Sequence, residues 1–237
     1  MGLQRYRAAI VDLDGTMVDT LGDFEVALNL TLADLALPPV TRALVERTVG
    51  KGSEHLIRTV LTHQIALPEA QGQGCASSTR TVDGLYQHAW QRYQHHYQAI
   101  NGEFSAVYPG VAEGLQALSA AGLALACLTN KPLAFARALL ASKGLAGHFS
   151  QVFGGDSFER KKPDPLPLLK TCEALGASPE VTLMVGDSSN DAQAGHAAGC
   201  GVVLVSYGYN HGQPIRQTPA LAWVDALTEI VPALAHR

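Results

Sequence analysis

Short apolar runs, each followed by polar residues, constrain the fold of this chain more than any other feature. They cover residues 7–11, 123–128, 181–185 and 201–205, with a weaker candidate at 151–153. Uninterrupted runs of this length are typical of strands buried on both faces of a parallel sheet. Helical patterns lie between them, at residues 112–121, 133–143, 165–175 and 191–198. The alternation predicts an α/β fold, a doubly wound parallel sheet of the Rossmann-like kind.

The interval between the first two runs is too long for a simple crossover, which needs only about a dozen residues. Its pattern is helical, at residues 21–36, 43–48, 53–66 and 81–99. We therefore expect an α-helical domain inserted at residues 19–107, and an α/β core made of residues 1–18 and 108–237. The Gly-, Ser- and Gln-rich stretch at residues 71–78 is expected to be a mobile loop.

Charge and hydropathy exclude several classes of protein. Lys and Arg number 17 against 21 Asp and Glu, a net charge of −4, so a dedicated nucleic-acid-binding protein is not expected. The longest apolar run, residues 120–128, is about half of a membrane span, and the N-terminal run stops at Asp12, unlike a signal peptide. The cysteines form no CxxC pair, which predicts free thiols in a cytoplasmic protein.

Polar residues follow the predicted strands, and the carboxyl ends of parallel strands share one edge of a sheet. The first run is followed by DLDGTMVD with Asp12 and Asp14, and the second by TNKP with Thr129. Further on stand KKPD with Lys162 and GDSSND with Asp187. Carboxylates gathered so closely repel one another unless a cation lies between them. Oxygen ligands of this kind point to Mg²⁺.

These four segments, in this order, resemble the motifs of the haloacid dehalogenase superfamily, specifically its phosphoglycolate phosphatase-like branch. The resemblance runs through nearly the whole chain and includes YGYN at residues 207–210. It implies a helical cap domain after the first strand, in agreement with the interval described above. It also implies a Mg²⁺-dependent phosphatase that hydrolyses a small phosphomonoester through an aspartyl-phosphate intermediate. The branch that the chain resembles points to 2-phosphoglycolate as the substrate, with glycolate and phosphate as products.

The resemblance also assigns catalytic roles to residues. Asp12 would be the nucleophile, and Asp14 would protonate the leaving oxygen and then deprotonate the attacking water. Thr129 would donate a hydrogen bond to the phosphoryl oxygens, and Lys162 would neutralise charge on the nucleophile and the phosphoryl group. Together these residues are chemically sufficient for phosphoryl transfer, which relies on positioning and electrostatics.

The same resemblance predicts the metal and phosphate contacts. Mg²⁺ would be held by the Asp12 side chain, the Asp14 backbone carbonyl and Asp187. Asp191 would support either the metal-bound waters or Lys162. Three further residues of these motifs, Gly15, Thr16 and Asn130, are expected to contact the phosphate or the substrate. Gly15 also permits a tight turn of the chain.

The predicted cap carries the candidates for substrate selection. Gly50-Lys51-Gly52 resembles the specificity loop of such caps, so Lys51 would meet a substrate carboxylate, with His55 or Arg58 assisting. An exposed loop lysine with no such role is the competing interpretation. Gly22-Asp23 stands where this branch often has Ala-Pro, close to the expected entrance, which leaves the identity of the substrate open.

Several alternatives stay open on the sequence. They are a phosphatase of another sugar phosphate, a phosphomutase of the same superfamily, and a catalytically inactive protein that binds a phosphorylated ligand. Dehalogenases and phosphonate hydrolases lack an aspartate at the position of Asp14, and a receiver domain lacks the long insertion. The expected partner is a small phosphorylated metabolite, without nucleic acid or membrane, and the chain is expected to be a monomer or a homodimer.

Overall fold

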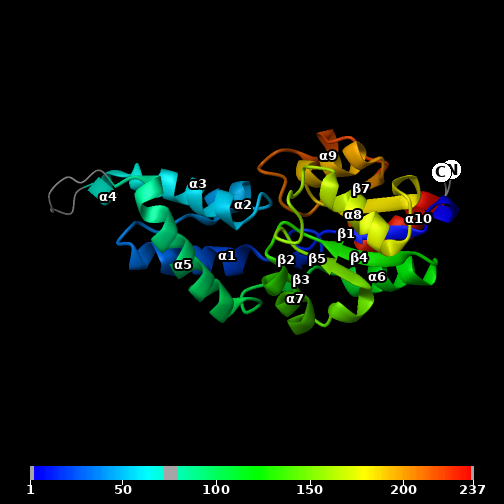
Figure 1. Ribbon diagram of the computed structural model, residues 1–237, viewed down its shortest axis with the longest axis horizontal. Helices are drawn as coiled ribbons and strands as arrows, with labels where there is room; N and C mark the ends of the chain where they lie inside the picture. The colour runs from blue at the N-terminus through cyan, green and yellow to red at the C-terminus, as the bar shows by residue number, and fades with distance from the viewer. Residues whose placement is uncertain (1–2, 72–79, 236–237) are drawn as a thin grey trace.

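The computed structural model describes residues 3–71 and 80–235. In Figure 1 the chain forms an α/β part and a helical part, which lie beside each other along the longest axis. Most of the predicted loop at residues 71–78, and Cys75 within it, lie outside the described residues.

The α/β part is built on six parallel strands in the order β5-β4-β1-β6-β7-β8. This confirms the predicted doubly wound sheet, including the weak candidate at β5. The strands are β1 (Ala8–Val11), β4 (Ala124–Leu128), β5 (Gln151–Phe153), β6 (Thr182–Gly186), β7 (Gly201–Val205) and β8 (Ala222–Val224). The edge strand β8 was not predicted; like the weak candidate β5 it has three residues, and a strand this short gives at most a weak pattern.

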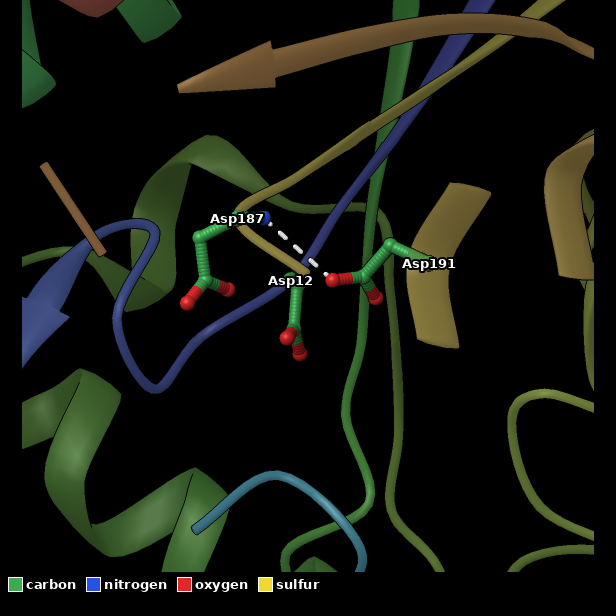
Figure 2. A group of neighbouring side chains, drawn as sticks. All are labelled: Asp12, Asp187 and Asp191. Atoms are coloured by element: carbon green, nitrogen blue, oxygen red, sulfur yellow. Dashed lines mark hydrogen bonds between the residues drawn. The ribbon is translucent and has the colours of Figure 1, made fainter. Parts of the chain in front are cut away.

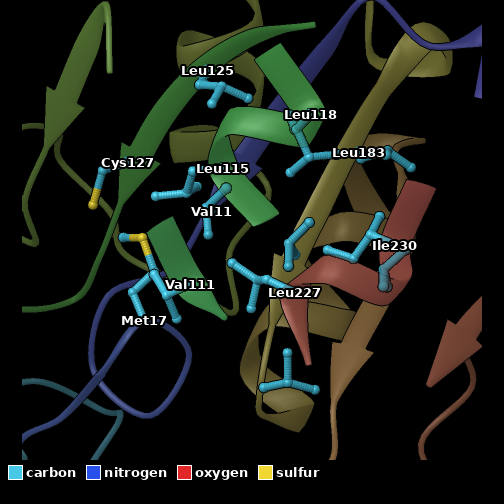
Figure 3. Packing of buried hydrophobic residues seen from close by; sticks show 14 of the residues in the cluster. Val11, Met17, Val111, Leu115, Leu118, Leu125, Cys127, Leu183, Leu227 and Ile230 are labelled. Carbon is cyan, nitrogen blue, oxygen red and sulfur yellow. The ribbon is translucent and has the colours of Figure 1, made fainter. Parts of the chain in front are cut away.

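Helices cover both faces of this sheet. The helices are α6 (Val111–Ala120), α7 (Leu133–Ser142), α8 (Leu166–Leu175), α9 (Ser189–Ala198) and α10 (Ile230–Ala235). Val11 packs with residues of α6, α7 and α10, as Figure 3 shows in part, whereas its neighbour Ile10 packs with residues of α8 and α9. Successive side chains of a strand point to opposite faces, so a strand covered on both sides must be apolar throughout.

The helical part lies between β1 and β4 in the chain, as the long interval predicted. Its helices are α1 (Leu21–Asp34), α2 (Arg42–Thr48), α3 (Ser53–Ile65), α4 (Pro68–Gln71) and α5 (Val82–Ile100). They share an apolar cluster separate from that of the sheet. Within it, the ring of Tyr97 stacks on those of Phe24 and Tyr93, each at 5.5 Å between centroids. No described helix has both the length and the apolar character needed to cross a membrane.

Two very short strands join the two parts. β2 (Val18–Asp19) pairs antiparallel with β3 (Ala106–Val107), so the chain leaves and re-enters the α/β part side by side. The sequence did not predict this ribbon, since two residues carry no alternation. The three cysteines in the described part, Cys127, Cys172 and Cys200, are buried free thiols, as expected.

Gly22 and Asp23, at the start of α1, contact the segment just before β3, where the chain returns from the helical part to the α/β part. The fully buried carboxylate of Asp23 accepts hydrogen bonds from the backbone N–H of Gly102 at 2.9 Å and of Phe104 at 2.7 Å. A Cβ on Gly22 would lie 2.2 Å from the Phe104 carbonyl oxygen, so only glycine permits this approach. The departure from Ala-Pro therefore has a structural explanation: the pair belongs to the junction, and neither residue lines the cavity described below.

We expect Asp23→Ala to lower the free energy of unfolding by about 3 kcal/mol, because the backbone N–H groups of Gly102 and Phe104 lose a buried, charged acceptor. Urea denaturation measures the change. Asp83→Ala is the matched control, since the side chain of Asp83 is 89% exposed on α5. A loss no larger than that of the control would show that water replaces the Asp23 carboxylate.

Candidate active site

Three carboxylates meet at the carboxyl ends of β1 and β6. Asp12 follows β1, Asp187 follows β6, and Asp191 lies in the first turn of α9. Each offers an oxygen within 4.8 Å of the others, and Figure 2 shows the three side chains converging on one region. The sheet edge therefore brings together acids that are far apart in the sequence, as predicted.

Lys162 lies against this group. Its Nζ is 2.7 Å from Asp191 Oδ1 and 3.0 Å from Asp12 Oδ1, and it donates to the Leu128 carbonyl at 2.9 Å. Only 2% of the side chain is exposed. Burial on its own lowers the pKa of a lysine, but the charges of Asp12 and Asp191 outweigh that effect and raise the pKa of Lys162. The lysine is therefore a fixed cation behind Asp12.

One lysine does not neutralise three acids. Burial, together with the charges of Asp191 and Asp14, raises the pKa of Asp12 from 3.8 to about 7, although Lys162 opposes the shift. Burial and the charges of Asp191 and Asp12 likewise raise the pKa of Asp187 well above its usual range. Asp12 Oδ1 also has no well-aligned hydrogen-bond donor in the described part of the chain. The donor set, oxygen-only and short of positive charge, fits a Mg²⁺ ion.

Asp187 is held in a fixed orientation. Its Oδ1 accepts from the Thr16 hydroxyl at 2.9 Å, and its Oδ2 accepts from the Tyr209 backbone N–H at 2.6 Å. Gly15 has φ +81°, and a Cβ there would lie 2.3 Å from Asp187 Oδ2. The Thr16 hydroxyl thus orients Asp187, and the absence of a side chain at Gly15 leaves room for its carboxylate. The Thr16 side chain is fully buried and does not line the cavity, so its hydroxyl is not placed for the predicted phosphate contact.

Asp191 uses both oxygens within the protein. Its Oδ1 accepts from Lys162, and its Oδ2 accepts from the hydroxyl of Ser188 at 2.7 Å and from the backbone N–H of Ser188 at 3.1 Å. Figure 2 marks a further bond to this oxygen, from the backbone N–H of Asp187 at 3.3 Å. Of the two roles considered on the sequence, this geometry favours positioning Lys162.

Asp14 forms a buried ion pair that sequence reasoning missed. Lys131 Nζ lies 2.7 Å from Asp14 Oδ1, and 2% of the lysine side chain is exposed. The ammonium also lies 4.5 Å from the centroid of the Phe24 ring and 4.9 Å from that of Tyr97, both from the helical part. Lys131 stands in the TNKP segment that was singled out for Thr129, so its place in that segment was the available signal.

A cavity lies between the sheet edge and the helical part. Residues of the α/β part line one side: Asp12, Asp14, Thr129, Asn130, Lys131, Asp187, Ser188 and Tyr209. Residues of the helical part line the other: Phe24, Val49, Gly50, Gly52, Ser53 and Leu56. The nucleophile and acid/base candidates therefore open onto a space that both parts enclose.

Asn130 connects the two sides of this cavity. Its side-chain amide donates to the Gly50 carbonyl at 2.9 Å and to the Lys162 carbonyl at 2.8 Å. Asn190 donates to the same Gly50 carbonyl at 3.3 Å. Thr129 lines the cavity, and its hydroxyl oxygen accepts from the Lys131 N–H at 3.2 Å. Asn130 thus binds the Gly50–Gly52 loop as well as facing the cavity.

The cap residues chosen from the sequence lie outside this cavity. Lys51 is exposed, and the cavity is lined by the glycines on either side of it. His55 is also exposed. Arg58 pairs with Glu54 at 3.2 Å and with Asp83 at 2.9 Å, on the surface of the helical part. In this arrangement the structure does not bring the predicted specificity residues to the site.

Comparison with known proteins identifies the family. The model of haloacid dehalogenase-like hydrolases matches residues 6–199. The chain belongs to the haloacid dehalogenase-like hydrolase family. The resemblance drawn from the four motifs is thus confirmed, with the α/β fold it implied.

Similar proteins span nearly the whole chain of this family member. It is 39% identical over 224 residues to a phosphoglycolate phosphatase of Thiobacillus denitrificans, covering 94% of this chain and 93% of that protein. It is also 39% identical, with the same coverage, to a phosphoglycolate phosphatase of Nitrosospira multiformis. The crystal structure of a predicted phosphoglycolate phosphatase from Haemophilus somnus superposes with a TM-score of 0.86 at 32% identity, covering 96% of this chain and 97% of that one.

In this haloacid dehalogenase-like hydrolase the YGYN segment contacts the loop that follows Asp12. The Tyr207 hydroxyl donates to the Thr16 carbonyl at 2.8 Å. The Tyr209 hydroxyl accepts from the Thr20 N–H at 3.0 Å and donates to the Asp19 carboxylate. The segment therefore fixes both the loop that follows Asp12 and the first crossing into the helical part.

The raised pKa values of Asp12 and Asp187 predict how stability depends on pH without metal. Between about pH 4 and pH 7 folded Asp12 keeps a proton that the unfolded chain has lost, so raising the pH across this window lowers the free energy of unfolding. Asp187 acts in the same direction. Saturating Mg²⁺ should remove most of the loss, since it stabilises ionised carboxylates. Urea denaturation from pH 5 to pH 8, with EDTA or Mg²⁺, measures this. Stability that rises with pH in EDTA would contradict it.

Proposed function

We propose that this protein is a Mg²⁺-dependent phosphatase that hydrolyses 2-phosphoglycolate to glycolate and phosphate. The observation that carries the proposal is one cavity onto which both Asp12 and Asp14 open, with Lys162 fixed behind Asp12. A nucleophilic carboxylate and an acid/base carboxylate at one site suit the hydrolysis of a phosphomonoester. The relatives named as phosphoglycolate phosphatases, at 39% identity over 94% of the chain, support the substrate.

In the proposed reaction Asp12 attacks phosphorus. A bond forms between a carboxylate oxygen of Asp12 and phosphorus, the bond from phosphorus to the ester oxygen breaks, and Asp14 gives its proton to the departing alkoxide. Asp14 then takes a proton from water, which attacks phosphorus, and Asp12 leaves with phosphate as the second product. Lys162 offsets negative charge at Asp12 throughout, and Thr129 is assigned to the phosphoryl oxygens from its place in the cavity lining.

The Asp12 side chain, the Asp14 backbone carbonyl and Asp187 are assigned to hold the Mg²⁺ ion. When bound, the ion neutralises the carboxylates and the phosphoryl oxygens, which otherwise repel each other. Asp191 is assigned to hold Lys162, and the hydroxyl of Thr16 to orient Asp187.

We further propose that residues 19–107 act as a cap domain over a core domain of residues 1–18 and 108–237. Two observations support this division: each part has its own apolar cluster, and the connections cross at the β2–β3 ribbon. A cap that closes over the substrate excludes water from the first step and must readmit it for the second.

Phosphate release across a panel of phosphomonoesters, with Mg²⁺ or with EDTA, tests the function. The panel includes 2-phosphoglycolate, sugar phosphates and nucleotides. We expect Mg²⁺-dependent release with the highest kcat/KM for 2-phosphoglycolate. A higher value for another ester would refute the substrate and keep the mechanism. Absence of release from every ester, in a folded protein that binds Mg²⁺, would favour a mutase or a ligand-binding protein.

A further inference from the structure

A substrate with a carboxylate needs a cation that is not already committed to the phosphoryl group. Lys162 is committed, since it lies within 3.0 Å of both Asp12 and Asp191. Among the described residues that line the cavity, Lys131 alone carries a positive charge. Any carboxylate that enters this cavity therefore meets one ammonium group, and that group comes from the sheet edge.

The cations of the helical part that the sequence suggested for substrate binding do not line the cavity. Lys51 is exposed beside the cavity, and neither it nor Arg58 contributes to the lining. The Arg58 guanidinium lies 4.1 Å from the centroid of the Tyr86 ring and pairs with Glu54 and Asp83. A guanidinium held by two carboxylates and a ring is not available to a ligand without breaking those contacts.

Lys131 has the capacity to bind a second carboxylate. An ammonium group has three N–H donors, and the described contacts supply one oxygen acceptor, that of Asp14 at 2.7 Å. The rings of Phe24 and Tyr97 contact the charge without accepting a strong hydrogen bond. They also exclude water, which strengthens the attraction between the ammonium and any anion beside it.

The position of Lys131 matches the shape of the substrate. Asp14 must reach the ester oxygen in order to protonate it, and in 2-phosphoglycolate three covalent bonds separate that oxygen from a carboxylate oxygen. A carboxylate so close to the ester oxygen lies next to Asp14, where Lys131 already is. An uncharged leaving group of the same length gains nothing from this ammonium.

We propose that Lys131 binds the carboxylate of the leaving group and so selects a carboxylate-bearing phosphomonoester. The inference rests on the proposed function, because it concerns the glycolate portion of 2-phosphoglycolate. It assigns substrate selection to the loop after β4, in place of Lys51. In the same position Lys131 also holds Asp14 beside the ester oxygen.

The test compares two substrates of similar length, 2-phosphoglycolate and ethyl phosphate, in wild-type protein and in Lys131→Met. We expect kcat/KM to fall by about 100-fold for 2-phosphoglycolate, mainly through KM, and by less than about 10-fold for ethyl phosphate, where only the placement of Asp14 suffers. Lys170→Met is the matched control, because Lys170 is an exposed lysine on α8. It should leave both values unchanged.

Lys131→Arg provides a second variant in case Lys131→Met does not fold. It keeps the charge but cannot reproduce the ammonium geometry, so it should again weaken 2-phosphoglycolate more than ethyl phosphate. Equal losses for the two substrates would overturn the inference, since Lys131 would then act only through Asp14. A selective loss in Lys51→Met with none in Lys131→Met would also overturn it. If the wild-type protein shows no preference for 2-phosphoglycolate, the proposed substrate and this inference are refuted together. The wild-type measurement alone gives that result, so it is distinguished from a failure of the inference, which only the variants reveal.

Discussion

Asp12→Asn is expected to lower kcat by at least about 1,000-fold, because an amide cannot act as the nucleophile that forms the phosphoenzyme. The fold should survive. Asparagine has the shape of aspartate, and Lys162 keeps Asp191 at 2.7 Å and the Leu128 carbonyl at 2.9 Å. Phosphate release from 2-phosphoglycolate at saturating Mg²⁺ measures the loss of activity.

The same variant should be more stable than wild type at pH 8 in EDTA. With a pKa of about 7, Asp12 is ionised at that pH at a cost to the folded state, and an uncharged amide removes the cost. Thermal unfolding measures this part of the prediction. Asp83→Asn is the control: it changes an exposed acid on α5, so it should leave activity unchanged and cost less than about 1 kcal/mol of stability, the contribution of an exposed ion pair such as that of Asp83 with Arg58. Activity above about a tenth of wild type, in protein whose mass shows no deamidation, would exclude Asp12 as the nucleophile.

Lys162→Met is expected to cost about 3–5 kcal/mol of unfolding free energy at pH 8 in EDTA, because it leaves buried carboxylates without their cation. Methionine fills nearly the same volume, so lost packing contributes little. The cost should shrink as the pH falls toward 5, where Asp12 and Asp187 take up protons in the folded state. We also expect kcat to fall by at least about 100-fold, since the charge near Asp12 is gone.

The adjacent lysine supplies the comparison for this prediction. Lys161 is exposed next to the buried Lys162, and Lys161→Met should change the free energy of unfolding by less than about 0.5 kcal/mol. Urea denaturation of both variants at pH 5 and pH 8 measures the loss of unfolding free energy for each lysine and its dependence on pH. If Lys162→Met were as stable as wild type at pH 8, Lys162 would not be compensating ionised carboxylates at that pH, and its role as the cation beside Asp12 and Asp191 would be refuted.

The sheet and the main helices could be predicted because their burial leaves a periodic trace. β1 and β6 are covered on both faces and therefore appear as unbroken apolar runs. The strands of the β2–β3 ribbon have two residues each and show no alternation, and β8, like the weakly predicted β5, has only three. The helical insertion was found for a different reason: no crossover connection needs so long an interval between neighbouring strands.

The group of charged residues at the sheet edge was predicted from the positions of the strands. The carboxyl ends of parallel strands lie at one edge of a sheet, so the sequence could group Asp12 and Asp187, which directly follow strands, with Lys162 in the loop after β5. Asp191 was predicted with two roles, and its hydrogen bonds to Ser188 and Lys162 favour one of them. A hydrogen-bond direction depends on side-chain orientation, which spacing along the chain does not specify.

The identity of the cavity cation depended on tertiary structure. Lys51 and Lys131 both lie in loops beside glycine or proline, and nothing in the order of residues says which one is buried. Burial follows from how α1 and α5 pack over the sheet edge, where Phe24 and Tyr97 enclose the ammonium of Lys131.

The sequence by itself determined the α/β class, the helical insertion and the set of acids, hydroxyl and lysine at one edge. All of these follow from local periodicity and from the rule that parallel strands align their ends. The tertiary structure decided which cation lines the cavity, which hydroxyl orients Asp187 and how Asp23 binds the chain where it returns from the helical part. Those features depend on contacts between residues far apart in the chain, and such contacts exist only once the helical part has packed against the sheet.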